Sequence, residues 1–302
     1  MKIGNLKSER QMPKHLSLGC SDKGSSLTFK NRFFLAPMLE YNDIAFRLLC
    51  KKAGVGLVYT GMVNPLNPKA IALDDKPGIQ LFSTSSKGIP AFIKKYDSKA
   101  SLWDFNLGCP SKIAKKLGFG VFLHNNIETI ESILKIIKNS TKKPITIKIR
   151  KSSETERIIK IAEKYCSAIC IHPRTAEQGY SGEPDIEYAE KIKSRVKIPV
   201  IYSGNVNEKN AKELLKKFDF VMIGREAIGD PNIFSRLQGK SNIIKYPFQE
   251  YLKLAEKYKL KYSQIKIQAL AFTRKKENAK KIRLEIVKAK TLDDIKKIMR
   301  EF

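Results

Sequence analysis

The chain has 302 residues, of which 58 are Lys or Arg and 30 are Asp or Glu, so its formal net charge is +28. Hydrophobic residues make up 42% of it, which is enough for a sizeable core and excludes a disordered basic tail protein. No apolar run approaches the roughly 20 residues of a membrane-spanning helix, and the first residues lack a secretory signal pattern. We therefore expect a folded cytoplasmic protein that meets a polyanion, nucleic acid first and an anionic membrane surface second.

Five cysteines, an odd number in a long chain, indicate reduced thiols rather than a disulfide framework. Cys166 and Cys170 lie close together in an apolar segment. A metal ion there would need two further ligands at a suitable spacing, and the sequence offers no obvious pair. We therefore expect no metal site and interpret both residues as small core side chains.

Eight short apolar runs of strand length follow one another along the chain. They are residues 33–37, 55–61, 78–82, 101–106, 144–149, 168–172, 199–203 and 219–224, with the irregular stretch 61–78 as the weakest part of the series. Helical patterns separate several of them, at about 42–53, 127–139, 153–165, 184–195 and 207–217. Apolar strands that alternate with helices predict a parallel α/β sheet, and eight of them favour a closed (β/α)8 TIM barrel over an open doubly wound sheet.

The pattern changes near Pro247, after which no run resembles a strand. Helical stretches begin near Phe248, Ser263, Glu277 and Thr291, and many of their residues are basic. Thr291 with Asp294 three positions later forms a start that resembles a capping box. We predict a basic N-terminal extension, a TIM barrel and a small C-terminal all-helical domain, at residues 1–30, 31–240 and 247–302.

Polar and reactive side chains gather where the predicted strands end, which is where barrels of this type carry their active sites. These strand ends carry Ala36-Pro37-Met38, Asn106 with Cys109, Lys148, His172 with Arg174, Ser203-Gly204-Asn205 and Gly224-Arg225. The last two groups combine glycines, backbone amides and a guanidinium. That combination at strands 7 and 8 of a barrel favours a phosphate site.

Three of these residues have more than one interpretation. Lys148 shares one face of its strand with Thr146 and Arg150, so it either points into the barrel and needs an anion or a polar ligand, or reaches solvent. Beside a flavin it would stabilise the reduced ring. His172 is either a site residue or a satisfied core histidine. Cys109, in a loop, would donate a proton with an ordinary thiol pKa of about 8.5, or act as a nucleophile with a lowered one.

The chain resembles the tRNA-dihydrouridine synthases, flavoproteins that reduce uridine in tRNA to 5,6-dihydrouridine. The most specific match is Asn106-Leu-Gly-Cys109-Pro-Ser. The matching segments run in family order, at residues 35–38, 46–47, 79–82, 104–112, 147–150, 171–175, 203–205 and 223–231. The helical tail is similar, more loosely, to the tRNA-binding domain of the family.

The resemblance implies a TIM barrel that binds FMN, takes electrons from NADPH or NADH and acts on tRNA. It implies that the flavin ring and ribityl chain contact Ala36, Pro37, Met38, Gln80, Lys148 and His172. It implies that the phosphate end is held by Ser203, Gly204, Asn205, Gly224 and Arg225. Asn106 and Arg174 would contact the RNA substrate, and Cys109 would be the general acid. Neither a membrane nor an obligate protein partner is expected.

Three positions depart from the family pattern. Ser203-Gly204-Asn205 stands where Asn-Gly-Asp is frequent, Ser83 where a glycine is usual, and Gln268 where the helical tail often has a histidine. Two alternatives stay open. One is another FMN barrel, of the dihydroorotate dehydrogenase type, which would act on a small free pyrimidine and would not need a charge of +28. The other is a catalytically inactive RNA-binding barrel, which would be colourless.

Overall fold

The computed structural model describes residues 16–18, 27–68, 70–241, 243–274 and 276–300. Seven parallel strands form one curled sheet in the order β3-β9-β8-β7-β6-β5-β4. The strands are β3 (Phe33–Leu35), β4 (Gly78–Leu81), β5 (Leu102–Leu107), β6 (Ile145–Arg150), β7 (Ala168–His172), β8 (Val200–Ser203) and β9 (Phe220–Ile223). The sheet confirms the predicted α/β barrel class and seven of the eight predicted strands.

The remaining predicted strand, residues 55–61, pairs only at isolated positions. Bridges join Leu57 to Phe34 of β3 and Tyr59 to Gly78 of β4. The backbone N–H of Leu35 also donates to the Leu57 carbonyl at 2.8 Å. This segment therefore lies between β3 and β4 and closes the barrel as an irregular eighth strand.

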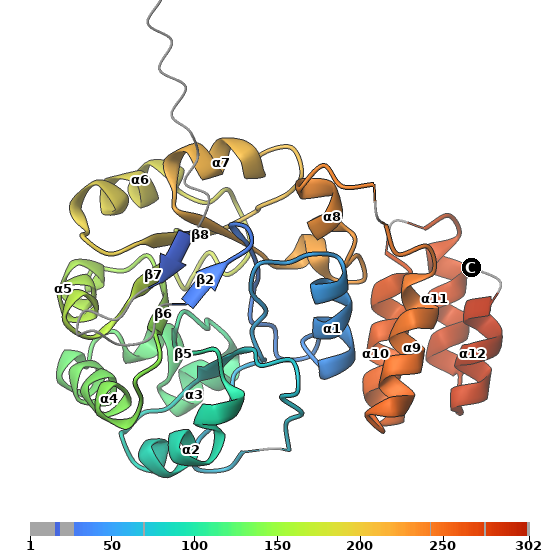
Figure 1. The fold of residues 1–302 in the computed structure, drawn as a ribbon, viewed down its shortest axis with the longest axis horizontal. Coiled ribbons are helices and arrows are strands. Elements are labelled where there is room, and N and C mark those ends of the chain that lie inside the picture. Colours follow the sequence, from blue (N-terminus) through green and yellow to red (C-terminus); the bar gives the residue numbers. More distant parts are fainter. Residues whose placement is uncertain (1–15, 19–26, 69, 242, 275, 301–302) are drawn as a thin grey trace, which may run out of the picture.

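Helices surround the sheet (Figure 1). They are α1 (Ile44–Lys52), α2 (Ile89–Tyr96), α3 (Lys112–Leu117), α4 (Ile127–Ser140), α5 (Thr155–Tyr165), α6 (Ile186–Arg195), α7 (Ala211–Lys217) and α8 (Ile233–Leu237). Three single turns of 3₁₀ helix add η1 (Asp97–Lys99), η2 (Gly120–Leu123) and η3 (Arg225–Ala227). The sequence predicts five of the eight α-helices and misses α2, α3 and α8, which have eight, six and five residues.

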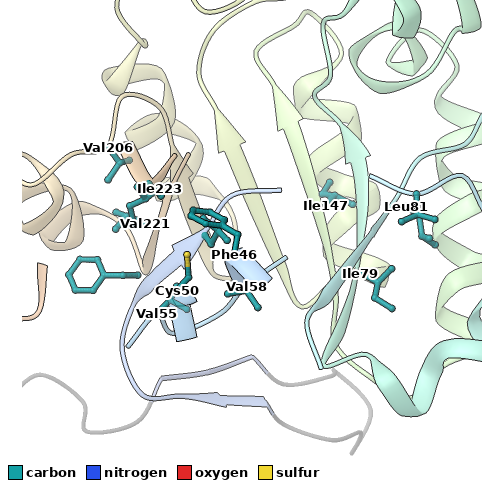
Figure 2. Close-up of a cluster of buried hydrophobic side chains, with 14 of the residues drawn as sticks. Phe46, Cys50, Val55, Val58, Ile79, Leu81, Ile147, Val206, Val221 and Ile223 are labelled. Carbon is teal, nitrogen blue, oxygen red and sulfur yellow. The ribbon is translucent and has the colours of Figure 1, made fainter. Parts of the chain in front are cut away.

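The core has two layers because side chains alternate between the two faces of each strand. Figure 2 shows the outer layer, in which Ile79, Ile147 and Val221 of the strands and Phe46 and Cys50 of α1 are buried. A separate inner cluster fills the barrel and consists of Leu18, Phe29, Phe34, Ala36, Leu57, Tyr59, Leu102, Ala168, Cys170, Ile201, Phe220 and Met222. Cys166 and Cys170 belong to the outer and inner layers respectively.

A hairpin closes the end of the barrel where the strands begin (Figure 1). It consists of β1 (Leu16–Leu18) and β2 (Leu27–Phe29), which pair antiparallel. The Phe29 ring lies 4.8 Å from the Phe34 ring and 5.4 Å from that of Phe220, the first residue of β9. Part of the predicted N-terminal extension therefore belongs to the barrel core, while residues 1–15 and 19–26 lie outside the described residues.

Four helices follow the barrel and lie beside α1 and α8 (Figure 1). They are α9 (Pro247–Lys257), α10 (Tyr262–Phe272), α11 (Ala279–Lys288) and α12 (Leu292–Arg300), and all four match predicted helices. At the start of α12 the Asp294 N–H donates to Thr291 Oγ1 and the Asp294 carboxylate accepts from the Thr291 N–H, as the sequence predicts. Among the helices of the described ranges, none has the length and apolar character to cross a membrane.

A buried carboxylate ties these helices to the barrel. Asp43, the N-cap of α1, accepts hydrogen bonds from Gln264 Nε2 at 3.0 Å and Gln268 Nε2 at 2.7 Å, and Tyr251 donates to it at 3.3 Å. Burial raises the pKa of Asp43, while the hydrogen bonds from the Phe46 N–H, Gln268 and Gln264 and the charge of Arg47 lower it. Gln268 is thus a fully buried link between the barrel and α10.

Gly229 permits the closest approach of the barrel to α10. Its φ is +73°, and a Cβ atom there would lie 2.0 Å from the Ala271 carbonyl oxygen. We expect Gly229→Ala to lower the free energy of unfolding by about 2–4 kcal/mol, measured by urea denaturation, because α10 must move away. Gly239→Ala is the matched control, since Gly239 has a φ of +65° but no atom within 4 Å of a Cβ. Equal losses in both variants would contradict the steric explanation.

Candidate active site

Polar side chains occupy the inward positions where the strands end. Along β5 the inward residues are Leu102, Asp104 and Asn106, so the interior changes from apolar to polar toward the carboxyl end of the strand. The strand register places Asn106 beside Lys148 and Arg150 beside His172. Three neighbouring strands, β5, β6 and β7, therefore bring an amide, two cations and an imidazole to one end of the barrel.

Cys109 follows β5 in a loop that three contacts hold. Asn106 Oδ1 accepts hydrogen bonds from the backbone N–H groups of Gly108 at 3.1 Å and Cys109 at 3.0 Å. Arg150 Nε donates to the Gly108 carbonyl at 2.9 Å. Gly120 has a φ of +67°, and a Cβ atom there would lie 2.6 Å from the Cys109 carbonyl oxygen. The half-buried Cys109 thiol is thus held at the mouth of the barrel.

A chain of hydrogen bonds runs from this loop into the barrel. Asn106 Nδ2 donates to Gln80 Oε1 at 2.8 Å, and Gln80 Nε2 donates to Asp104 Oδ2 at 2.6 Å. Thr146 donates to the other oxygen of Asp104 at 2.5 Å. Burial raises the pKa of Asp104 to about 7, although the hydrogen bonds from Thr146 and Gln80 and the charge of Lys148 lower it.

This raised pKa predicts a pH dependence of stability. The folded chain holds the Asp104 proton more tightly than the unfolded chain does, so the free energy of unfolding should fall as the pH rises from the ordinary pKa of 3.8 to about 7. Asp104→Asn has no carboxylate to ionise and should not show this fall. The free energy of unfolding of Asp104→Asn minus that of wild type should therefore increase by about 1.4 kcal/mol per pH unit across this range. Urea denaturation between pH 4 and pH 7 measures it, with the exposed Asp293→Asn as control. A difference that does not change with pH would contradict the assignment.

His172 lies in a strongly positive environment. It is 6% exposed, and burial, followed by the charges of Lys148, Arg150, Arg174 and Arg225, holds its pKa well below the ordinary value. The Arg174 Nη1 lies 3.2 Å from His172 Nε2. Because a guanidinium only donates, Nε2 accepts and the proton of the neutral imidazole lies on Nδ1. Four cations around a neutral imidazole favour an anionic ligand.

The ends of β3, β8 and β9 form a corner suited to a phosphate. Asn205 has a φ of +47°, and its Oδ1 accepts a hydrogen bond from Arg225 Nη2 at 2.5 Å. The atom nearest to a Cβ on Gly224 would be Ala36 Cβ, at 3.5 Å, so this position leaves room beside β3. Gly204 is more tightly enclosed, since its Cβ would lie 3.1 Å from Pro184. Ser203 is buried at the end of β8.

Pro37 and Met38 follow Ala36 at the end of β3, and both are half-buried. Arg174 lies inside the site rather than on its surface. Its side chain is fully buried and donates to the carbonyls of Ser181 and Gly182, in the loop after β7. Its contact with RNA stays a prediction, and in this structure it holds that loop against His172.

Three residues of the site had no role in the sequence analysis: Asp104, Gly120 and Tyr180. Tyr180 is 62% exposed, and its ring centroid lies 5.3 Å from Arg150 Cζ and 5.4 Å from Arg225 Cζ. Its ring centroid also lies 6.2 Å from that of His172, so Tyr180 packs beside His172 from the loop after β7. Arg150 could be recognised from the sequence, because it lies two residues after Lys148 and so on the same face of the strand. No sequence pattern in the loop after β7 indicates Tyr180.

The family profile described as dihydrouridine synthase (Dus) matches residues 34–296. The chain belongs to the dihydrouridine synthase family. It is 31% identical over 231 residues to tRNA-dihydrouridine synthase B of Shigella flexneri, covering 69% of this chain and 72% of that protein. A probable tRNA-dihydrouridine synthase of Rickettsia bellii is 32% identical over 237 residues, covering 71% of this chain and 73% of that protein.

Solved structures confirm the barrel fold of this dihydrouridine synthase family member. Histamine dehydrogenase from Rhizobium sp. 4-9 superposes with a TM-score of 0.57 at 13% identity, over 80% of this chain and 50% of that chain. TcOYE with pHBA superposes with a TM-score of 0.53 at 10% identity, over 79% of this chain and 95% of that chain. At these identities the likeness concerns the fold alone.

Proposed function

We propose that this chain is a tRNA-dihydrouridine synthase that reduces the C5–C6 double bond of specific uridines in tRNA. The observation that carries the proposal is the Cys109 thiol at the mouth of a barrel whose end is lined with cations, in a member of this family. The relatives named tRNA-dihydrouridine synthase, at 31–32% identity, support the same activity.

The residues at the strand ends fit FMN. The positive charge around His172 suits a ligand with a phosphate and an electron-accepting ring, and Gly224 leaves room where a larger residue would intrude. We assign the ring and ribityl chain to Ala36, Pro37, Met38, Gln80, Lys148 and His172. We assign the phosphate to Ser203, Gly204, Asn205, Gly224 and Arg225. Bound FMN supplies the hydride for the reduction, with NADPH or NADH as the electron source.

The chain's own residues then supply the proton and the charge. The Cys109 thiol donates a proton to C5 of the uracil, and Asn106 holds the loop that carries it. The positive charge of Lys148 would stabilise the reduced ring of a flavin held beside it. Asn106 and Arg174 are the residues that we assign to the RNA substrate. Arg174 is buried, so it acts by holding the loop after β7 in place.

We assign tRNA binding to the helical part, residues 247–302, beside a catalytic barrel at residues 31–240. A cleft of about 450 Å³ lies where the two meet, lined by Glu40, Tyr41, Ile228, Ile267, Leu270, Ala271, Arg274 and Arg283. Arg274 Nη1 donates to the Arg225 carbonyl at 2.6 Å, so the basic helices continue into the proposed phosphate corner. RNA held there presents a base to the barrel only if that base leaves its stack.

One experiment separates the candidate functions. The purified protein is loaded with FMN and incubated with NADPH and either unmodified tRNA or a free pyrimidine, and the 5,6-dihydro product of each substrate is measured by mass spectrometry. We expect the visible absorption of a flavin and product only in tRNA. Product only from the free pyrimidine would support the dihydroorotate dehydrogenase type instead. A protein that binds tRNA but takes up no flavin would be the inactive RNA-binding barrel.

The affinity for tRNA should fall steeply as salt increases. Each phosphate that a Lys or Arg neutralises releases counterions, and this term scales with the number of contacts. We expect Arg274→Gln combined with Arg283→Gln to reduce the slope of log affinity against log salt by about one per lost contact. Filter binding over a salt series measures the slope. Lys216→Gln, in an exposed ion pair on α7, is the control, and an equal change in slope there would contradict the proposed surface.

A further inference from the structure

Asp104 is a buried carboxylate that the proposed chemistry does not use. It is 1% exposed, and both of its hydrogen bonds come from neutral donors, Gln80 and Thr146. The ionisable groups that act on it are Lys148 on β6, Tyr59 on the strand-like segment, Cys170 on β7 and Cys166 just before β7. Burying an ionised carboxylate without a cation bonded to it lowers the free energy of unfolding at neutral pH. We therefore ask what Asp104 contributes to the site.

Above a pH of about 7, Asp104 is an ionised carboxylate that has only acceptors, so each neighbour must turn a donor toward it. Gln80 therefore directs Nε2 at Asp104 and leaves Oε1 for Asn106 Nδ2. Asn106 in turn directs Oδ1 at the N–H groups of Gly108 and Cys109. The two amides are nearly symmetric in shape and either could face the other way, whereas the carboxylate at one end and the two N–H groups at the other permit a single direction.

We propose that Asp104 is the positioning residue that sets the direction of the Gln80–Asn106 amide pair and so holds the loop of Cys109. If Gln80 were reversed, Asn106 would turn its NH₂ group toward the two N–H groups of the loop, donor against donor. The loop would then lose both hydrogen bonds from its N–H groups to Asn106, while those at the Gly108 and Cys109 carbonyls would remain. This inference deepens the proposed function, because it rests on Cys109 being the residue that the loop must place.

The rate at which iodoacetamide alkylates Cys109 in the cofactor-free protein, followed by peptide mass spectrometry, tests the positioning role. Asp104→Leu should raise this rate by about fivefold for each net hydrogen bond that the loop loses. Asp104→Asn should stay within about twofold of wild type, because its oxygen accepts from Gln80 while its NH₂ donates to Thr146. Thr146→Val, which removes the other hydrogen bond of Asp104, should also leave the rate unchanged. An unchanged rate in Asp104→Leu overturns the proposal.

A compensating pair keeps the test decisive if Asp104→Leu does not fold. Gln80→Glu sets two carboxylates against each other, so at pH 8.5 it should raise the alkylation rate. Adding Asp104→Asn gives the new carboxylate a donor and should return the rate to within about twofold of wild type. Absence of that rescue overturns the proposal. None of these rates depends on turnover, so a Cys109 that proved not to be the acid would leave this result standing.

Discussion

Replacing Cys109 with alanine should lower the rate of dihydrouridine formation by about 100- to 10,000-fold, the usual contribution of a general acid. The thiol lies at the mouth of the barrel, and the Asn106, Arg150 and Gly120 contacts that place it act on backbone atoms. Those contacts persist in Cys109→Ala, so the binding of FMN and of tRNA should stay within about threefold of wild type. Single-turnover assays with pre-reduced enzyme measure the chemical step, and flavin fluorescence and filter binding measure the two affinities.

Cys166→Ala is the matched control, because Cys166 is buried in the outer core layer just before β7. It should cost stability and leave the single-turnover rate of the folded protein unchanged. Cys109→Ser should fall between wild type and Cys109→Ala, since a hydroxyl is a much weaker acid than a thiol. If Cys109→Ala formed dihydrouridine at a near-normal rate, the acid would have to be another group or water.

The barrel could be predicted because its signal is local. A buried parallel strand is a short apolar run. For Ala168–His172 the strand bounds predicted from the sequence are those found in the structure. The C-terminal helices were equally accessible, down to the reciprocal cap of Thr291 and Asp294. Most of the missed elements are too short to show such a pattern, whereas α2 does show one, with Ile89, Phe92 and Ile93 on its buried face, that the sequence analysis did not use. Only Ala114 of α3 is buried, and each hairpin strand has three residues.

The sequence indicated which residues stand at the ends of the strands. It did not indicate which side chains would form hydrogen bonds with them. The position of Cys109 after a strand is a property of one segment. The hydrogen bonds of Asp104 join it to Gln80 and Thr146, which are 24 and 42 residues away, and only the register of β4, β5 and β6 brings them together. The burial of Arg174 was also not predictable. The loop that encloses its guanidinium has no periodic pattern from which its position could be inferred.

A buried ion pair gives the second large expected effect. Arg47 of α1 donates to both carboxylate oxygens of Asp75 at 2.8 Å, and the side chains of the two residues are 1% and 0% exposed. The same guanidinium donates to the carbonyls of Asn42 and Ala72 at 2.7 Å. We expect Arg47→Met to lower the free energy of unfolding by about 3–5 kcal/mol, because it leaves the Asp75 carboxylate buried without its partner. Urea denaturation at neutral pH measures the loss.

The double variant Arg47→Met, Asp75→Leu separates the ion pair from the packing. An apolar pair of similar volume is often as stable as the buried ion pair that it replaces, so most of the lost stability should return. A double variant as unstable as Arg47→Met would show instead that the bonds to Asn42 and Ala72 dominate. Asn42 makes that outcome consequential for the site, since its Nδ2 donates to the carbonyls of Ala36 and Tyr59 at 2.8 Å each. Loosening Asn42 would then separate β3 from the irregular strand beside it, and both variants should weaken the flavin binding that we propose at Ala36.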